Sequence, residues 1–294
     1  MKTNKRSIQF TVLTLFPDLI ENYLGDALLS KAIQQNRIQV KVVSLRSFSI
    51  GRYKSIDDVP YGGGDGMVFK ASVLEGALNS IQEKSTTKKK IIYLSPQGQT
   101  WNHSLAQKMA NEWSYSVDTK NRATDVEFEV ILICGRYAGI DQRFIQKYVD
   151  EEISIGDYVL SGGELAALVL IESISRYIPG VLGDEQSASK DSFEDNWLEA
   201  PQFTKPQVWA EMAIPEVLAS GNHQKIAEWK KYASWLVTFK KRPDLFAARF
   251  KMGQIDFEKD AWKKLTSFYK SLSVEDKKIL QLEGLELEKI EGSR

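Results

Sequence analysis

The sequence has very few of the residues that cross-link a fold or bind zinc. It contains one cysteine, Cys134, and two histidines among 294 residues. A single cysteine excludes an internal disulfide framework and is typical of a protein in the reducing cytoplasm. With so few thiol and imidazole groups, a zinc site of the usual kind is not expected. We therefore predict a cytoplasmic protein and assign no metal ligand.

Long apolar runs are also absent. The longest, Leu165 to Ile174, is too short for a membrane span and is interrupted by Glu172. The basic start "MKTNKRSIQFTVLTLFPDL" is broken by Pro17 and Asp18 and has no small-residue cleavage signature, which favours a β-strand over a signal peptide. No membrane partner is predicted. Lys plus Arg and Asp plus Glu both number 39, so net charge neither favours nor excludes a nucleic acid.

What the chain does contain is an alternation of strand and helix patterns in its first part. Strands are expected over residues 8–16, 37–45, 89–96, 126–135 and 151–156, and helices over residues 19–35, 71–82, 102–113, 141–149 and 164–176. This order predicts an α/β fold, with a mostly parallel sheet covered by helices on both faces. The continuous apolar run "VILIC" is typical of a central strand.

The character of the sequence changes after Gly180. Residues 181–196 are small, polar and acidic, as in a linker. Strand patterns then disappear, and residues 223–246 have apolar side chains at helical spacing, with Pro243 after the expected end of the helix. We predict an α/β domain over residues 1–182, a flexible linker over residues 183–191 and a small helical domain over residues 192–294.

Three of the predicted strands end in loops of unusual composition. They are "YLSPQGQ" (residues 93–99), "CGRYAGID" (residues 134–141) and "IGDYVLSGGE" (residues 155–164). Ligands of parallel sheets bind at the carboxyl ends of the strands, and glycine lets a ligand approach the main chain. One such loop is as easily a tight turn, but three favour a ligand. Since the Walker and Rossmann glycine patterns are absent, the loops suit an adenosine group better than a triphosphate.

An ordered set of motifs carries a resemblance to a known family. The motifs are "FPDL", "DDVPYGGGDGM", "YLSPQGQ", "CGRYAGID", "SIGDYVLSGGE", "SRYIPGVLG", "DSF" and "ASGNHQKI". Over residues 8 to about 245 the chain resembles the bacterial tRNA (guanine-N1)-methyltransferases of the SPOUT superfamily, which methylate guanosine 37, next to the anticodon. The resemblance implies a deep trefoil knot in the C-terminal half of the sheet, which general rules of topology would argue against. It also implies tRNA as partner and a homodimer with active sites at the subunit interface.

The same resemblance implies S-adenosyl-L-methionine as the cofactor, held by the three loops. The residues carried over are Tyr93, Leu94, Ser95, Pro96, Gly135, Tyr137, Ile155, Gly156, Asp157, Tyr158, Val159, Leu160, Ser161, Gly162 and Gly163. The chain departs from the family at Ala138, where a glutamate is expected to help place the amino-acid end of the cofactor or a magnesium ion. This departure weakens the case for Mg²⁺ and keeps open an alternative, an RNA-binding SPOUT protein with impaired or lost catalysis.

Two residues are candidates for the chemistry. Guanine N1 carries a proton at neutral pH, so methylation there needs a base and a positive group near O6. The resemblance assigns these roles to Asp191 and Arg176, respectively. Each residue also has a structural interpretation: Asp191 with Glu194 has the spacing of a capping box, and Arg176 is a cation at the end of an apolar helix. A related enzyme acting on a ribose or on rRNA is disfavoured, because ribose methylation needs no acid at residue 191.

Candidate RNA contacts lie in two regions, a glycine-rich loop and a basic helix. They are Arg52, Gly63, Gly64, His223, Lys230, Lys241 and Arg242. Basic side chains bind phosphates, and nearby tryptophans and tyrosines are able to stack on unpaired bases. Taken alone, the helix is better explained by a solvated basic face above an aromatic core.

Overall fold

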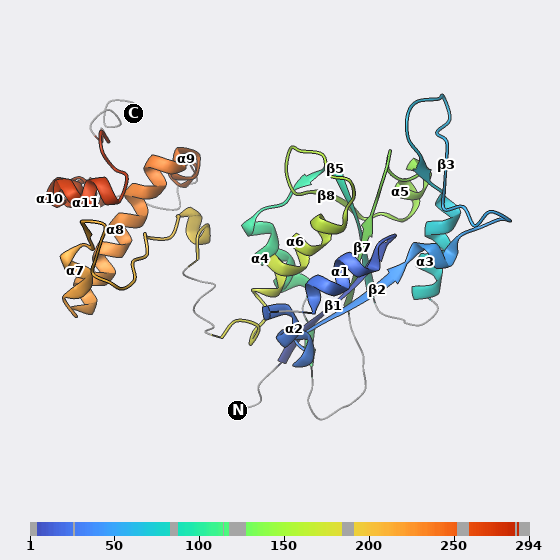
Figure 1. The fold of residues 1–294 in the computed structure, drawn as a ribbon, viewed down its shortest axis with the longest axis horizontal. Coiled ribbons are helices and arrows are strands. Elements are labelled where there is room, and N and C mark those ends of the chain that lie inside the picture. Colours follow the sequence, from blue (N-terminus) through green and yellow to red (C-terminus); the bar gives the residue numbers. More distant parts are fainter. Residues whose placement is uncertain are drawn as a thin grey trace. The chain divides into compact units, whose positions relative to one another are not determined.

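The chain divides into two compact units, Met1–Ala188 (unit 1) and Ser189–Arg294 (unit 2). The computed structural model describes residues 5–25, 27–82, 88–113, 115–117, 128–183, 191–251, 259–285 and 287 (Figure 1). Most of the expected linker, residues 184–190, therefore lies outside the described residues. Among the described helices, none combines the length and the apolar character that a membrane crossing requires.

Unit 1 is built on a parallel sheet, as the alternating pattern predicted. Its described strands are β1 (Lys5–Thr14), β2 (Ile38–Ser44), β5 (Lys88–Thr100), β7 (Phe128–Cys134) and β8 (Glu151–Ser154), in the order β2-β1-β7-β5-β8. The short strand β6 (Tyr115–Val117) adds to β1 in the antiparallel sense. The strand with the "VILIC" run, β7, pairs in parallel with both β1 and β5 and is central, as expected.

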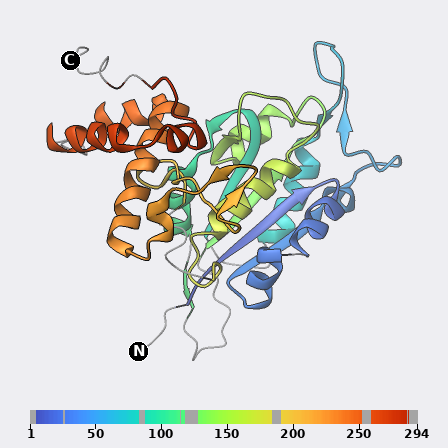
Figure 2. The same cartoon turned by 60° about the vertical axis from the view of Figure 1, so that its left-hand side comes forward.

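Helices cover both faces of this sheet (Figure 1, Figure 2). One core combines Val130 and Leu132 of β7 with apolar side chains of α1 (Pro17–Leu24), α2 (Ala27–Gln34), α4 (His103–Trp113) and α6 (Glu164–Ser175). The other combines Ile131 and Ile133 with α3 (Ala71–Gln82) and α5 (Gln142–Tyr148). Successive β7 residues thus face opposite layers, which is why the strand is apolar throughout.

One helix boundary differs from the prediction. The segment 19–35 forms two helices, because α1 ends at Gly25, whose N–H donates to the Glu21 carbonyl, and Ala27 has φ 53°. Short elements fill the connection from β2 to α3: a 3₁₀ helix, η1 (Leu45–Phe48), and the antiparallel pair β3 (Asp57–Asp58) and β4 (Val68–Phe69).

The pairing of β5 with β8 is interrupted by an irregular segment of β5. Leu94 and Gln99 both pair with Ile153, so residues 95–98 leave the ladder between them. The chain returns at Gly98, where an added Cβ would lie 2.3 Å from the main-chain carbon of Glu152. Non-bonded atoms do not approach this closely, so residue 98 has to be glycine where β5 crosses β8. The "SPQG" loop is positioned by this close approach of two backbones.

Replacing Gly98 with alanine should therefore destabilise unit 1. The new methyl group would push β5 away from β8, at a cost of about 2–3 kcal/mol in the free energy of unfolding, as for an overpacked core. Urea unfolding followed by circular dichroism measures this cost. The matched control is Gly183→Ala, where an added Cβ meets nothing within 4 Å. Equal stability of the two variants would show that the crossing tolerates a side chain.

Unit 2 is mainly helical, but it is not free of strands. Its helices are α7 (Glu216–Ala219), α8 (His223–Lys241), α9 (Pro243–Lys251), α10 (Lys259–Ser271) and α11 (Val274–Ile279), with a 3₁₀ helix η3 (Glu194–Asn196). The expectation that strands disappear is wrong, since β9 (Val208–Trp209) and β10 (Met212–Ala213) form an antiparallel pair. Strands this short leave no period of two in the sequence. Ala210 and Glu211, both with positive φ, make the tight turn.

An aromatic core holds unit 2 together. Trp229 and Leu236 of α8, at the predicted helical spacing, pack with Phe246 of α9 and with Trp262 and Leu265 of α10. Pro243 begins α9 immediately after α8 rather than only ending the earlier helix, which fits its preference for the first turn.

Candidate functional site

A cavity of about 370 Å³ lies where the expected glycine-rich loops meet, at the carboxyl ends of β7 and β8 and beside the interruption of β5 at residues 95–98. It is lined by Tyr93, Leu94, Ser95, Pro96, Gln97, Gly135, Arg136, Tyr137, Ala138, Gly139, Ile140, Gln142, Ile145, Ile153, Ser154, Ile155, Gly156, Tyr158, Val159, Leu160, Ser161, Gly162, Gly163 and Ala166. Every predicted cofactor residue except Asp157 is in this set. The folding of unit 1 therefore brings the three segments together, but the first is not a strand end: β5 was predicted to end at residue 96 and instead continues to Thr100, because Gln99 and Thr100 pair again with β8.

Sequence reasoning missed some of the lining residues. Gln97, Arg136, Gly139 and Ile140 lie within the motifs already recognised, so taking each motif whole would have included them. The contributions of Gln142 and Ile145, on α5, had no such signal. They line the cavity because α5 packs beside the loop that precedes it, which only the tertiary structure decides.

The glycines of the loops let one backbone pack on another. A Cβ at Gly163 would lie 2.8 Å from the Cα of Cys134, and a Cβ at Gly135 would lie 2.8 Å from the Tyr93 hydroxyl. The Gly163 N–H donates to the Gly135 carbonyl at 3.0 Å. Some of the glycines thus allow the loops to pack closely on each other. Gly156 has a different role: with φ +147°, it adopts a conformation that other residues rarely take.

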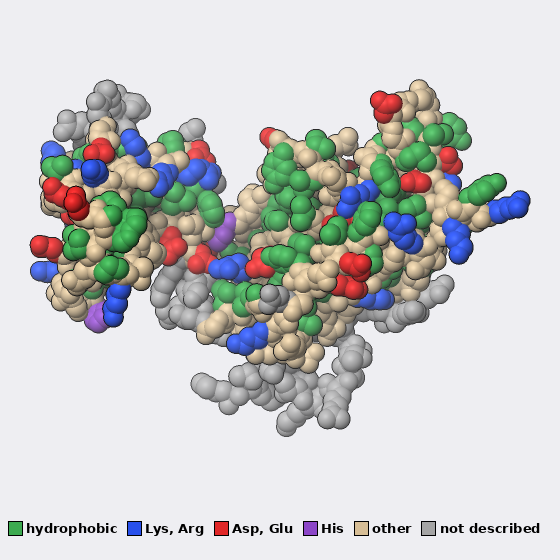
Figure 3. All heavy atoms as spheres, viewed as in Figure 1, with side chains coloured by type: hydrophobic (Ala, Val, Ile, Leu, Met, Phe, Trp, Pro, Cys, Tyr) green, Lys and Arg blue, Asp and Glu red, His purple; other side chains and the backbone are tan. Residues whose placement is uncertain are grey.

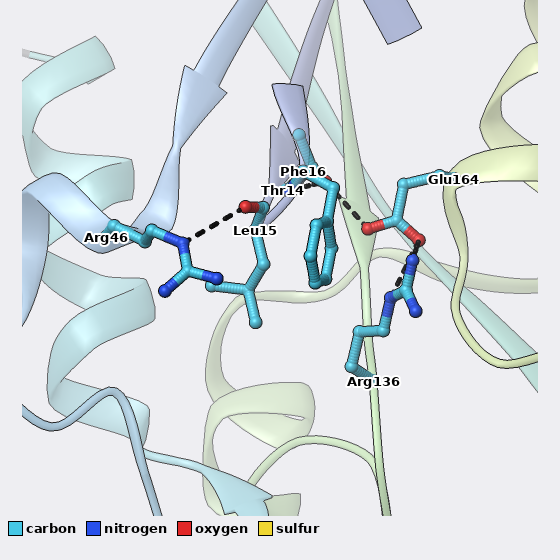
Figure 4. Close-up of polar contacts among 6 residues, drawn as sticks. All are labelled: Thr14, Leu15, Phe16, Arg46, Arg136 and Glu164. Atoms are coloured by element: carbon cyan, nitrogen blue, oxygen red, sulfur yellow. Dashed lines mark hydrogen bonds and ion pairs between the residues drawn. The ribbon is translucent and has the colours of Figure 1, made fainter. Parts of the chain in front are cut away.

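A buried carboxylate fixes this arrangement (Figure 4). Glu164, the first residue of α6, is 2% exposed. One of its oxygens accepts a hydrogen bond from the Thr14 hydroxyl at 2.7 Å, and the other accepts from Nε of Arg136 at 3.1 Å and pairs with the same guanidinium through a second nitrogen. Glu164 therefore joins the ends of β1 and β7 to the start of α6.

Aromatic and glycine neighbours complete the network around Arg136. Figure 4 shows the Phe16 ring between the guanidinium groups of Arg46 and Arg136, which lie 5.7 and 4.3 Å from its centroid. A Cβ at Gly162 would lie 2.3 Å from Nε of Arg136, so the pair leaves no room for a side chain there. The "FPDL" and "SGG" motifs are thus partly explained by packing around one ion pair.

Removing the charge of Glu164 should loosen this corner of the cavity. Glu164→Gln leaves the Arg136 guanidinium, 18% exposed, without its carboxylate. Loss of one partner of a buried pair is expected to lower the free energy of unfolding by about 3 kcal/mol, measurable by urea denaturation. Glu172→Gln, on the same helix but with an exposed hydrogen bond to Tyr23, should change it by less than about 0.5 kcal/mol. A similar loss in both variants would count against a special role for Glu164.

The lining of the cavity has very few charged side chains. Of the described residues that line it, only Arg136 carries a formal charge, and none is Asp or Glu. Burial, followed by the nearby Glu152, raises the pKa of Tyr93. Among the residues that the structure describes, no three Asp, Glu, His or Cys side chains gather as a metal site would require.

Arg176 lies at the C-cap of α6, as the sequence predicted. Two contacts with the start of α4 hold the last turn of this helix. Trp101 Nε1 donates to the Ser173 hydroxyl at 3.0 Å, and the Tyr177 hydroxyl lies 2.9 Å from a ring nitrogen of His103. These contacts flank Arg176 in sequence and fix the backbone from which its side chain extends.

Asp191 belongs to unit 2, whereas the cavity and Arg176 belong to unit 1. The 3₁₀ helix η3 begins later than the motif suggested, with Phe193 at the N-cap and φ 78°, and the Asp191 carbonyl accepts from the Glu194 N–H at 3.4 Å.

The candidate RNA contacts are distributed over both units. In unit 1, Arg52 is exposed, and Gly63 and Gly64 have positive φ with open space beside them. Figure 3 shows Lys and Arg side chains at the tip of a loop that projects near β3. In unit 2, His223 is the first residue of α8, Lys230 and Lys241 are exposed, and Arg242 pairs with Asp244 at 2.6 Å.

The aromatic residues of α8 serve the core of unit 2. Trp229, Tyr232 and Trp235 are buried, and Trp235 stacks on Trp197 with ring centroids 5.2 Å apart. They are therefore not available to stack on bases in this conformation. The basic side chains of α8 remain the candidates for contacts with RNA.

This fold and cavity define an α/β protein in which three glycine-rich loops line one cavity. A sequence profile described as tRNA (Guanine-1)-methyltransferase TrmD matches residues 8–248. The chain is 43% identical to a tRNA (guanine-N(1)-)-methyltransferase of Hahella chejuensis over 242 residues, which cover 82% of this chain and 88% of that one. A protein of the same name from Clostridioides difficile is 40% identical over 81% of this chain and 97% of its own. The chain belongs to the tRNA (guanine-1)-methyltransferase family, as the motifs predicted.

Proposed function

We propose that this protein is an enzyme that transfers the methyl group of S-adenosyl-L-methionine to N1 of guanosine 37 in tRNA. The observation that carries the proposal is the coincidence of family and geometry. The family match covers residues 8–248, and its glycine-rich motifs line one cavity beside β5, β7 and β8. An activity assay with two tRNA transcripts, with guanosine or adenosine at position 37, tests it directly.

The cavity suits the adenosine part of the cofactor. Its volume is about 370 Å³, and its walls offer main-chain groups of the segments 93–97, 135–140 and 153–163. The Tyr93 phenol, whose pKa burial raises, offers an O–H group at the cavity wall. When bound, the cofactor supplies an activated methyl group on a sulfonium. The protein then has mainly to orient it and to exclude water.

Two side chains then act on the guanine. Asp191 removes the N1 proton, and Arg176 stabilises the negative charge that develops on O6. Arg176 begins from a helix end that His103 and Trp101 hold in place, which supports a fixed position for its guanidinium. Because Asp191 is in unit 2, we propose that a homodimer brings it to the cavity of the partner subunit.

Two features of unit 1 support a knotted chain and a homodimer. Gly98 crosses the backbone of β8 without room for a Cβ, as a tightly threaded chain requires, and we propose the trefoil knot of the SPOUT fold here. Apolar side chains are exposed on neighbouring helices, Leu19 and Tyr23 on α1 and Leu165 and Val169 on α6. Such a patch is typical of a subunit interface.

The remaining assignments concern RNA and metal. We propose that unit 2 binds tRNA through the exposed lysines of α8, with the projecting loop of unit 1 as a second contact. The alternative is a relative that binds RNA without catalysis, favoured by Ala138 alone. A requirement for Mg²⁺ is not part of the proposal.

Asp191→Ala should abolish catalysis while leaving the cofactor bound. Loss of a general base is expected to lower the rate constant of methyl transfer about 10³-fold. Calorimetry with S-adenosyl-L-methionine should give an unchanged affinity. Asp195→Ala, in the same segment, is the control and should retain turnover within about twofold, as expected for a residue without a role in proton transfer. Near-normal turnover by Asp191→Ala would remove Asp191 from the mechanism.

Arg176 should matter for the rate rather than for cofactor affinity. Arg176→Ala is expected to lower kcat about 10²-fold, because charge on O6 is no longer stabilised, with KM for S-adenosyl-L-methionine unchanged. Arg176→Lys keeps the charge but not the planar fork of the guanidinium. Its kcat should therefore lie between those of the wild type and of Arg176→Ala. Steady-state kinetics with guanosine-37 transcripts decide this. A change confined to KM would instead indicate a binding role.

A further inference from the structure

The end of α6, from which Arg176 extends, is held by a long hydrogen bond within the helix itself. The helix ends at Ser175, and the Arg176 N–H donates to the Glu172 carbonyl at 3.4 Å. A well-formed bond of this kind is about 2.9–3.0 Å long, and the last turn of a helix frays readily. An arginine at this point therefore needs contacts from outside the helix to act from a fixed position.

Trp101, just before α4, supplies the first of these contacts. Its indole N–H donates to the Ser173 hydroxyl at 3.0 Å. That hydroxyl in turn donates to the Val169 carbonyl at 2.6 Å, so its proton and one of its lone pairs are both used. Ser173 lies close to one helical turn before Arg176. The indole therefore binds the last turn of α6, the turn that leads into Arg176.

His103, the first residue of α4, supplies the second contact. A nitrogen of its ring lies 2.9 Å from the Tyr177 hydroxyl, and the two rings meet edge to face with centroids 5.6 Å apart. Tyr177 directly follows Arg176 in the chain. The start of α4 thus holds the chain on both sides of the arginine, in agreement with the packing of α4 beside α6 (Figure 1).

The main chain of Trp101 contacts the wall of the cavity. Its N–H donates to the Ser154 carbonyl at 2.7 Å, directly after the pairing of Thr100 with Ser154. The Ser154 hydroxyl accepts from the Gly156 N–H at 3.2 Å, and Ser154 and Gly156 both line the cavity. Trp101 thus joins the cavity wall, through its backbone, to the helix end that bears Arg176, through its side chain.

A purely structural interpretation accounts for the ring of Trp101 better than for its N–H group. The ring is partly buried and packs against the core of unit 1. On the same turn of α6, the buried Ser175 hydroxyl has no hydrogen-bond partner, so the fold tolerates an unbonded hydroxyl there. The bond from Trp101 to Ser173 is therefore better explained by a need for a fixed helix end than by packing.

We propose that Trp101 is a positioning residue for methyl transfer, because its hydrogen bond to Ser173 fixes Arg176 relative to the cavity wall. The inference rests on the proposed role of Arg176 and adds to it a residue that acts through the end of α6. A displacement of about 1 Å in a reacting group is enough to slow a reaction up to about 100-fold. Loss of this bond should therefore affect the rate rather than the binding of the cofactor.

Steady-state kinetics on the full chain, with guanosine-37 transcripts, test this assignment. Trp101→Phe keeps an aromatic ring and removes the N–H group. It should lower kcat about tenfold, with KM for S-adenosyl-L-methionine within about twofold of the wild type. Ser173→Ala removes the other partner of the bond and should give the same result. The matched control is Ser175→Ala, which removes a hydroxyl without a partner from the same turn, so kcat should stay within about twofold.

Double variants show whether the effect passes through Arg176. Trp101→Phe combined with Ser173→Ala should be no slower than either single variant, because both remove the same hydrogen bond. In an Arg176→Ala background, Trp101→Phe should lower kcat no further, since the group that it positions is gone. If Trp101→Phe is less stable to heat than the wild type, Ser173→Ala, which loses only a hydroxyl, carries the test.

Three results would overturn the inference. They are a normal kcat in both Trp101→Phe and Ser173→Ala, an equal loss in Ser175→Ala, and an undiminished loss when Trp101→Phe is added to Arg176→Ala. A change confined to KM would also contradict it. If Arg176→Ala itself kept a normal kcat, the proposed role of Arg176 would fail, and the inference with it. A slow Arg176→Ala beside a normal Trp101→Phe and Ser173→Ala would refute the inference alone.

Discussion

The buried carboxylate of Glu164 is the interaction on which the ligand cavity depends. It binds the Arg136 guanidinium on one side and the Thr14 hydroxyl on the other, so the ends of β1 and β7 and the start of α6 share one anchor. Its position at the first turn of α6 is also where the helix dipole favours a negative charge. The ion pair also leaves no room for a side chain at Gly162, whereas at Gly163 it is the backbone of Cys134 that excludes one.

The two units differ in the interactions that hold them together. Unit 1 closes a cavity with bare backbone and one ion pair, whereas unit 2 packs a cluster of aromatic rings around α8. That core includes Trp262 and Leu265 of α10, which lie beyond the range matched by the family, residues 8–248. The additional helices therefore complete the apolar core around α8 and leave its lysines exposed.

The charge distribution around the cavity links its architecture to its chemistry. Of the described residues that line it, only Arg136 is charged, and Glu164 pairs with this guanidinium from the first turn of α6. The segment 67–69, hydrogen-bonded to residues 138, 139 and 141, brings a loop from before α3 to this wall.

The sequence by itself determined the α/β order, the central β7, the three loops and the family, because each leaves a local pattern of apolar spacing or glycine. Only the tertiary structure decided which of these glycines pack on backbone, as Gly98 does on β8. It also decided the partner of Glu164, since Arg136 is 28 residues away and no periodicity connects them. The break between α1 and α2 and the β9–β10 pair escaped prediction for a related reason: a few residues with positive φ set them, and Ala27, Ala210 and Glu211 carry no such preference.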